Sequence, residues 1–189
     1  IKKLRDRGIE NPIVVTTYYN IPYVIGIGNF MNRIREAGAQ AVIIPNVPFE
    51  EADVLLAEGK RNSIHTIFQI APTTTEDRLK KITDIASGFL YVINVEGVTG
   101  ARESLDDSTL KLVQRVRRHT DMPLMAGFGI SNKQQASNVV AAGADGAIAG
   151  SCYAKIYEKN LEKPEETLHQ IAQLVGQIKQ GCIEGYRRR

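Results

Sequence analysis

The stretches MAGFGIS, residues 125–131, and GAIAGS, residues 146–151, each end an apolar run on glycine just before a helical pattern begins. Strands that feed helices carry their chemistry at their carboxyl ends, where such turns lie. Glycine lets the backbone approach a ligand closely, and the first turn of a helix presents unpaired N–H groups that suit an anion. Either turn alone fits a plain strand-to-helix connection equally well, but their order and spacing together favour a phosphate site.

Outward from these stretches, short apolar runs alternate with amphipathic helical patterns. The runs are continuous rather than alternating in polarity, which is typical of parallel strands that are buried on both faces. This rhythm predicts an α/β protein with right-handed crossovers, either an open doubly wound sheet or a (β/α) barrel. We expect six strand-plus-helix units in one domain over residues 1–189. The six apolar runs are residues 11–20, 40–48, 65–72, 88–95, 122–129 and 146–151.

Several helix starts can be predicted from the residues that cap them. Thr73 with Glu76, and Ser131 with Gln134, have the spacing of capping boxes, and Pro164 suits a first helical turn. Two arginine clusters, RVRR at 115–118 and YRRR at 186–189, are interpreted as a solvated helix face and a frayed terminus rather than nucleic-acid contacts.

Composition excludes several classes of protein. The formal net charge of +3 is too small to indicate nucleic-acid binding, and no apolar run has the roughly 18 residues of a membrane span. Two cysteines cannot form a disulfide framework, and no Cys or His spacing indicates a metal site. We therefore expect a cytoplasmic protein without a metal. The first residue is Ile1 rather than Met, which suggests that the natural N-terminus lies upstream.

Taken in order, several motifs resemble the alpha subunit of tryptophan synthase over nearly the whole chain, from about Ile13 to about Gly181. They include PIVVTTYYN (12–20), EGVTGARESL (96–105), GFGISNKQQ (127–135) and GADGAIAGSCYAKIYEKN (143–160). The resemblance implies a (β/α)8 TIM barrel, of which these six units correspond to strands 3 to 8. It also implies cleavage of indole-3-glycerol phosphate to indole and glyceraldehyde 3-phosphate, in a cytoplasmic heterotetramer with the beta subunit. The alpha subunit would need no cofactor, because pyridoxal phosphate belongs to the beta subunit.

The same resemblance assigns roles to individual residues. The phosphate ligands that it implies are Gly100, Gly129, Gly150 and Ser151. The substrate pocket would be lined by Tyr18, Tyr91, Thr99, Gly127 and Phe128, with Tyr91 beside the indole ring and Thr99 on a loop that closes over the substrate. Asn20 and the turn after it would face the beta subunit.

The chain also departs from the family pattern. The family's catalytic glutamate and aspartate lie in a segment of the type ELGIPFSDP, and none of the 189 residues forms such a segment. We expect the chain by itself to be inactive, and Glu96 is the one acidic residue found at a strand end before a glycine turn. Asn46 and Val95 stand where the family often has aspartate and arginine, respectively.

Two alternative functions remain open from the sequence. The chain could be a non-catalytic phosphate-binding or interaction fragment that needs a partner to supply further strands. It could also be another phosphate-binding barrel enzyme of tryptophan or histidine biosynthesis, since related barrels share the phosphate cradle.

Overall fold

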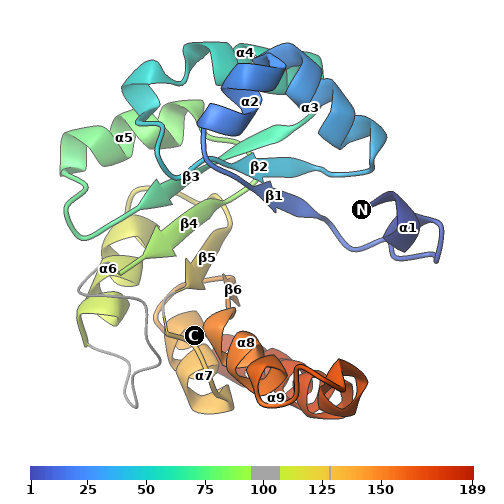
Figure 1. Cartoon of the computed structure of the whole chain (residues 1–189). Coiled ribbons are helices and arrows are strands. Elements are labelled where there is room, and N and C mark those ends of the chain that lie inside the picture. The colour runs from blue at the N-terminus through green and yellow to red at the C-terminus, as the bar shows by residue number, and fades with distance from the viewer. Residues whose placement is uncertain (95–106, 128) are drawn as a thin grey trace. The chain divides into compact units, whose positions relative to one another are not determined.

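The computed structural model describes residues 1–94, 107–127 and 129–189. Its helices and strands follow the predicted alternation (Figure 1). The strands are β1 (Val14–Thr16), β2 (Ala41–Ile43), β3 (His65–Ile70), β4 (Leu90–Ile93), β5 (Leu124–Gly127) and β6 (Gly146–Ala147). The α-helices are α1 (Lys2–Arg5), α2 (Asn20–Ile25), α3 (Ile27–Glu36), α4 (Asp53–Arg61), α5 (Glu76–Ile85), α6 (Asp107–Arg117), α7 (Lys133–Ala141), α8 (Ser151–Glu158) and α9 (Leu168–Tyr186). Short 3-10 turns cover Phe49–Glu51 and Pro164–Thr167.

Each predicted apolar run contains one strand, so the α/β fold with successive strands is confirmed. The chain divides into two compact units, which are described separately. The first unit holds residues 1–69 and 80–90, and the second holds residues 70–79 and 91–189. The prediction of one domain over residues 1–189 stays a prediction.

In the first unit, β1, β2 and β3 are parallel and follow one another in chain order. Val14 pairs with Ala41, and Ala41 pairs with His65 on its other side. All three residues of β2 are buried, because β2 is the central strand of the three. A core beside it takes Phe30, Met31 and Ile34 from α3, Val42 from β2 and Leu55 from α4.

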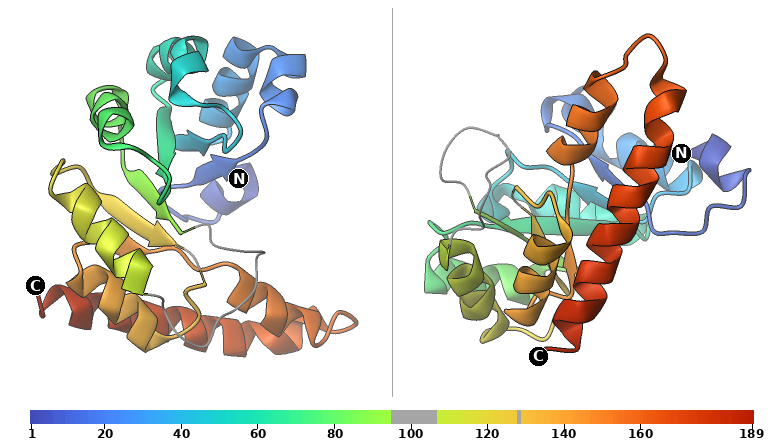
Figure 2. Two further views of the ribbon diagram at one scale, coloured as in Figure 1. Left: turned by 90° about the vertical axis from the view of Figure 1, so that its left-hand side faces the viewer. Right: turned by 90° about the horizontal axis from the view of Figure 1, so that it is seen from below.

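In the second unit, β5 and β6 are parallel, with Met125 paired to Gly146. The long helix α9 lies against α7 (Figure 2). Gly181 and Gly185 make this approach possible, since a Cβ on Gly181 would lie 2.2 Å from Lys133 O and one on Gly185 would lie 2.3 Å from Ser137 O. A side chain at either position would force the helices apart.

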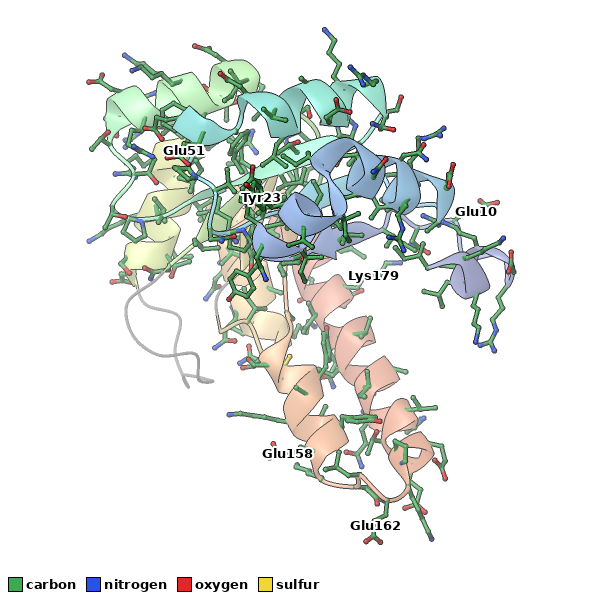
Figure 3. The ribbon with its side chains drawn as sticks, turned by 45° about the horizontal axis from the view of Figure 1, so that its top comes forward. Glu10, Tyr23, Glu51, Glu158, Glu162 and Lys179 are labelled. Carbon is green, nitrogen blue, oxygen red and sulfur yellow. The ribbon has the colours of Figure 1, made fainter. Side chains whose placement is uncertain are left out.

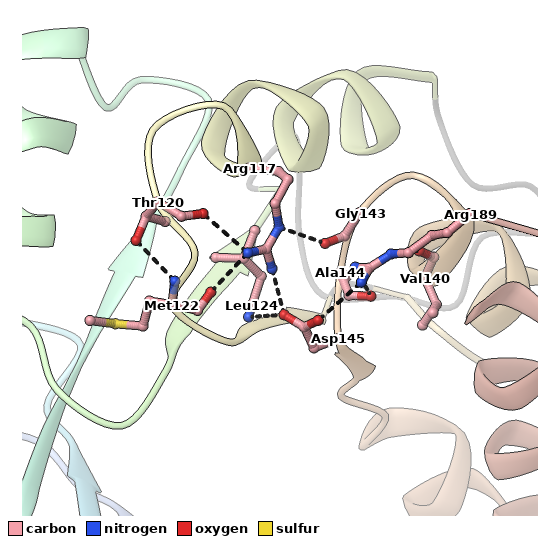
Figure 4. A network of polar contacts seen from close by, with 9 residues as sticks. All are labelled: Arg117, Thr120, Met122, Leu124, Val140, Gly143, Ala144, Asp145 and Arg189. Atoms are coloured by element: carbon pink, nitrogen blue, oxygen red, sulfur yellow. Dashed lines mark hydrogen bonds and ion pairs between the residues drawn. The ribbon is translucent and has the colours of Figure 1, made fainter. Parts of the chain in front are cut away.

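Arginines of both predicted surface clusters form specific contacts at the amino ends of β5 and β6 (Figure 4). Asp145, the residue before β6, accepts hydrogen bonds from Leu124 N, Arg117 and Arg189. Arg117 also donates to Gly143 O, and Arg189 also donates to Ala144 O at 2.7 Å. The predictions of a wet helix face and a frayed terminus are therefore wrong for these residues, because partners distant in sequence satisfy their guanidinium groups.

The predicted helix caps are shifted along the chain. The start of α7 is capped by Asn132, whose Oδ1 accepts from Gln135 N at 2.9 Å, rather than by Ser131 with Gln134. Before α5, the Thr75 hydroxyl accepts from Arg78 N, so Thr73 is not the cap. Pro164 does lie in the first turn that leads into α9. Within the described residues, no helix has the length and apolarity needed to cross a membrane.

Candidate functional site at the carboxyl ends of the strands

Gly127, the last residue of β5, is covered by the aromatic ring of Tyr91 from β4. A Cβ on Gly127 would lie 2.7 Å from Tyr91 Cε2 and 2.8 Å from Ile148 Cβ, so only glycine permits this packing. Ile148 is held at the same level, since its N–H donates to Ala126 O at 2.8 Å. Burial raises the pKa of the Tyr91 hydroxyl, which therefore stays protonated at neutral pH. Tyr91 thus offers an apolar ring face and a hydroxyl donor beside the end of β5.

The turn after β5 is open at Gly129. This residue has φ of 66°, and a Cβ there would have no heavy atom within 4 Å. The turn is held from its far side, where Ser131 N and Ser131 Oγ both donate to Gln135 Oε1 at 2.8 and 3.1 Å. In the part of the chain that the structure describes, no side chain beyond its neighbours therefore lies at the Cβ position of Gly129.

The turn after β6 is also open, at Gly150. Gly150 caps α8 without a side-chain hydrogen bond, and a Cβ on it would also meet nothing within 4 Å. The first amides that donate within α8 are those of Tyr153 and Ala154, both to Gly150 O. The N–H groups of Ser151 and Cys152 precede them, as the free donors of a first helical turn do, and no backbone acceptor for either lies among residues 1–94, 107–127 and 129–189. Both Gly150 and Ser151 are exposed, so this helix start can receive an anion.

Asn94, which sequence reasoning did not select, joins the carboxyl end of β4 to the start of α6. Its side chain is buried, and its Nδ2 donates to Ser108 Oγ at 2.7 Å and to Thr109 Oγ1 at 2.8 Å. Its Oδ1 is among the buried polar atoms without a hydrogen-bond partner. A polar residue that directly follows an apolar strand was the available signal, and LYVIN at 90–94 shows it.

Some of the predicted site residues cannot be placed. Thr99, Gly100 and Phe128, together with Glu96 and Val95, lie outside the described residues. The structure brings Gly127 and Tyr91 into contact, and it leaves Gly129, Gly150 and Ser151 open at turns that follow the paired strands β5 and β6. Their roles in phosphate or indole binding remain predictions.

Tyr18 and Asn20 belong to the first unit, at the end of β1 and the start of α2. Around them lies a set of exposed apolar side chains, here called the α2 surface. Figure 3 labels one of them, Tyr23 of α2. Its members are Tyr18 (65% exposed), Ile21 (47%), Tyr23 (69%) and Val24 (83%). Asn46 supports this surface from the turn after β2, because its Oδ1 accepts from Tyr19 N at 3.0 Å. The amide at position 46 thus keeps the acceptor that an aspartate would provide.

The described residues contain no group of three or more His, Cys, Asp or Glu side chains that could hold a metal ion. Cys152 is a buried free thiol at the start of α8, and Cys182 is also free. The chemistry that the described residues offer is therefore recognition by amides, hydroxyls and aromatic rings.

Comparison with known proteins places these features in one family. A family model for the tryptophan synthase alpha chain matches residues 1–183. The tryptophan synthase alpha chain of Methanopyrus kandleri is 42% identical over 94% of this chain and 64% of its own length. That of Methanocaldococcus jannaschii is 43% identical over 86% of this chain and 57% of its own. The chain thus spans about 60% of the length of these relatives.

Solved structures agree with these sequence relatives. The tryptophan synthase A-subunit of Pyrococcus furiosus superposes with a TM-score of 0.83 at 29% identity, covering 94% of this chain and 69% of that one. A chain from a structure of the tryptophan synthase α2β2 complex of the same organism gives 0.85 at 31% identity, over 94% and 70%. This likeness confirms that the six βα units have the fold of the alpha-subunit TIM barrels.

Proposed function

The chain belongs to the tryptophan synthase alpha chain family, and from this premise we propose that it supplies the phosphate-binding and indole-contacting part of an alpha subunit. The reaction is the cleavage of indole-3-glycerol phosphate to indole and glyceraldehyde 3-phosphate. The observation that carries the proposal is the pair of open turns after β5 and β6, beside the Tyr91 ring on Gly127. Open amides suit the phosphate, and an aromatic ring suits the indole.

In this proposal, the phosphate accepts hydrogen bonds from the backbone at Gly129 and Gly150 and from the amide and hydroxyl of Ser151. Gly100 would add a further amide. The start of α8 contributes the positive end of its helix dipole. The indole ring would lie against Tyr91, with Thr99 and Phe128 beside it. No cofactor is required for these contacts.

A binding measurement with two ligands tests this assignment. We expect indole-3-propanol phosphate to bind the chain more tightly than ribose 5-phosphate by calorimetry, because only the former has an indole for Tyr91. Ser151→Asp should weaken both ligands about tenfold or more, since it places a carboxylate where the phosphate binds. Gln170→Glu adds the same charge on an exposed turn of α9 and should leave both affinities unchanged.

Equal affinity for the two ligands would remove the indole assignment and favour another phosphate-binding barrel enzyme. Affinities that Ser151→Asp leaves unchanged would remove the phosphate site itself.

We also propose that the 189-residue chain does not turn over the substrate by itself. Cleavage requires protonation of the indole C3 and removal of a proton from a glycerol hydroxyl, which calls for two carboxylates in different environments. The sequence offers no segment of the type that carries the family's Glu/Asp pair. Measurable turnover would contradict this proposal, and loss of that turnover in Glu96→Gln would then identify Glu96 as the acid.

For the beta subunit, we propose the α2 surface as the contact region, with Asn20 within it. Exposed apolar side chains gathered on one short helix are typical of a protein interface. Val24→Asp should weaken binding of a beta subunit about tenfold, because it buries a charge at the interface. Val54→Asp, on the exposed side of α4 in the same unit, is the matched control and should bind normally.

A further inference from the structure

The first unit contains a pocket of about 490 Å³ at the amino end of β3. Residues of α4, of the turn before β3 and of the end of α5 line it. Its apolar wall comes from Leu56 of α4, Ile64 in the turn before β3, and Ile85 at the end of α5. The volume falls within the range of pockets that hold small organic ligands.

A buried hydroxyl in this pocket lacks a partner. Thr66 lines the pocket with 6% of its surface exposed, and its Oγ1 is one of the buried polar atoms without a hydrogen bond. Gly59 of α4 lies beside it, and a Cβ there would be 3.1 Å from Thr66 Oγ1 and 2.8 Å from Ile64 O. Leaving a hydroxyl buried and unpaired costs free energy. An acceptor from a ligand would therefore replace the hydrogen bond to water that the hydroxyl loses when the chain folds.

Around the pocket, the backbone acceptors already have hydrogen-bond partners, whereas the side-chain donors have none within the described part of the chain. The carbonyls at the end of α4 are already occupied: Glu58 O by Asn62 N, Gly59 O by Ile64 N, and Lys60 O by Ser63 N. The donors are not, since neither the Thr66 hydroxyl nor the Lys60 ammonium has a partner among the described residues. His65 lines the same opening. The pocket therefore presents donors and positive charge above an apolar wall.

We propose that this pocket binds a small amphipathic carboxylate. Its apolar body packs against Leu56, Ile64 and Ile85. One carboxylate oxygen accepts a hydrogen bond from Thr66 Oγ1, and the negative charge pairs with Lys60. The site is separate from the proposed phosphate site, and neither assignment depends on the other.

Titration of the full 189-residue chain with 3-phenylpropanoate, followed by methyl NMR, tests the proposal. We expect saturable shifts at the methyl groups of Leu56, Ile64 and Ile85. The uncharged analogue 3-phenylpropanamide should bind at least about fivefold more weakly, because it lacks the charge that pairs with Lys60. The absence of a saturable shift up to about 10 mM would overturn the proposal, as would equal affinity for the two compounds.

Substitution of the threonine separates a binding role from a structural one. Thr66→Val keeps the shape but removes the hydroxyl, so it should weaken 3-phenylpropanoate about tenfold, in line with a hydrogen bond to a charged group. The same change should raise the Tm of the unliganded chain, because it removes an unpaired buried group. Thr66→Ser retains the hydroxyl and should retain binding. Unchanged affinity in Thr66→Val would contradict the proposal.

Substitution of the lysine tests the charge. Lys60→Met should weaken the carboxylate about threefold, the modest effect of an exposed ion pair, and leave the amide unaffected. Lys3→Met, on α1 of the same unit, is the matched control and should change neither affinity. Shifts that appear at the methyl groups of Ala126 and Ile148 instead of around Thr66 would show that the probe binds beside Tyr91 in the second unit, and the proposal would fail.

Discussion

The second unit uses its polar groups in opposite ways at the two ends of β5 and β6. At the amino ends, Asp145 joins Leu124, Arg117 and Arg189 in a connected network. At the carboxyl ends, an added Cβ on Gly129 or Gly150 would meet no heavy atom of the described residues within 4 Å, and within that part of the chain the first amides of α8 have no backbone partner. Parallel α/β proteins place stabilising contacts at the first end and ligands at the second. The difference indicates that the amino ends hold the strands in place so that the carboxyl ends can stay open.

The largest loss of stability is expected where α7 packs against α9 in the second unit. Gly181→Ala puts a Cβ 2.2 Å from a backbone carbonyl and should lower the free energy of unfolding by about 3 kcal/mol. Gly176→Ala in the same helix meets nothing within 4 Å and should raise it by about 0.5 to 1 kcal/mol. Urea unfolding of both variants checks the contrast, and similar midpoints would show that the seam tolerates a methyl group.

A smaller loss is expected when the network itself is broken. Asp145→Ala leaves Leu124 N without its acceptor and removes the carboxylate from two guanidinium groups that keep only carbonyl partners, which should cost about 2 kcal/mol in unfolding free energy. Asp121→Ala removes an exposed carboxylate of the same unit and serves as the control. The affinity of each variant for indole-3-propanol phosphate, corrected for the fraction of protein that is folded, should be unchanged. A large loss of affinity in Asp145→Ala alone would mean that the network at the amino ends of β5 and β6 also supports ligand binding at their carboxyl ends.

Acid should weaken the same network. Partial burial raises the pKa of Asp145, but the hydrogen bond from Leu124 N and the charges of Arg117 and Arg189 outweigh it and set the pKa below its usual value. Asp145 therefore contributes stability above its unfolded pKa near 4, and that contribution disappears as pH falls through the lower folded pKa. Because the carboxylate is partly exposed, the charge contributes about 1 kcal/mol or less. Unfolding free energies of the wild-type and Asp145→Ala chains should converge between pH 5 and pH 2, in about that amount.

The smallest change in unfolding free energy is expected at the carboxyl ends of the strands, where a substitution should stabilise the chain rather than destabilise it. Ser151→Asp places a negative charge at the start of α8, which should stabilise the unliganded chain by about 0.3 to 0.5 kcal/mol. The same substitution is expected to abolish most phosphate affinity, so loss of binding would occur without loss of stability. A destabilised variant would show that Ser151 has a structural role that the exposed helix start does not reveal.

The parts that could be predicted from sequence were those that depend on neighbouring residues. The continuous apolar runs identified the strands of the described residues, and the glycines at positions 127, 129 and 150 lie at the end of β5 and in the turns after β5 and β6. The arginine contacts could not be predicted, because Arg117 and Arg189 bond to Asp145 across 28 and 44 residues. Periodicity around an arginine shows a polar position on a helix, but it does not show which distant acceptor lies opposite.

The cap of α7 was missed by one residue for a similar reason. Ser131 and Gln134 have the right spacing, but Ser131 N and Oγ donate to Gln135 Oε1, and Asn132 Oδ1 accepts from Gln135 N as the cap. Asn94 was missed because a single polar residue at a strand end is common, and only its two hydroxyl partners on α6 give it a specific role.

The reach of Arg189 back to Asp145 also bears on the order in which the second unit is completed during synthesis. Domains form progressively as the chain emerges from the ribosome. The aspartate before β6 can bind Arg117 at once, but its second guanidinium is translated 44 residues later. A nascent chain therefore holds Asp145 with Arg117 alone until the 44 further residues that end in Arg189 have been made, so the last contact of this network forms only when synthesis of the unit is almost finished.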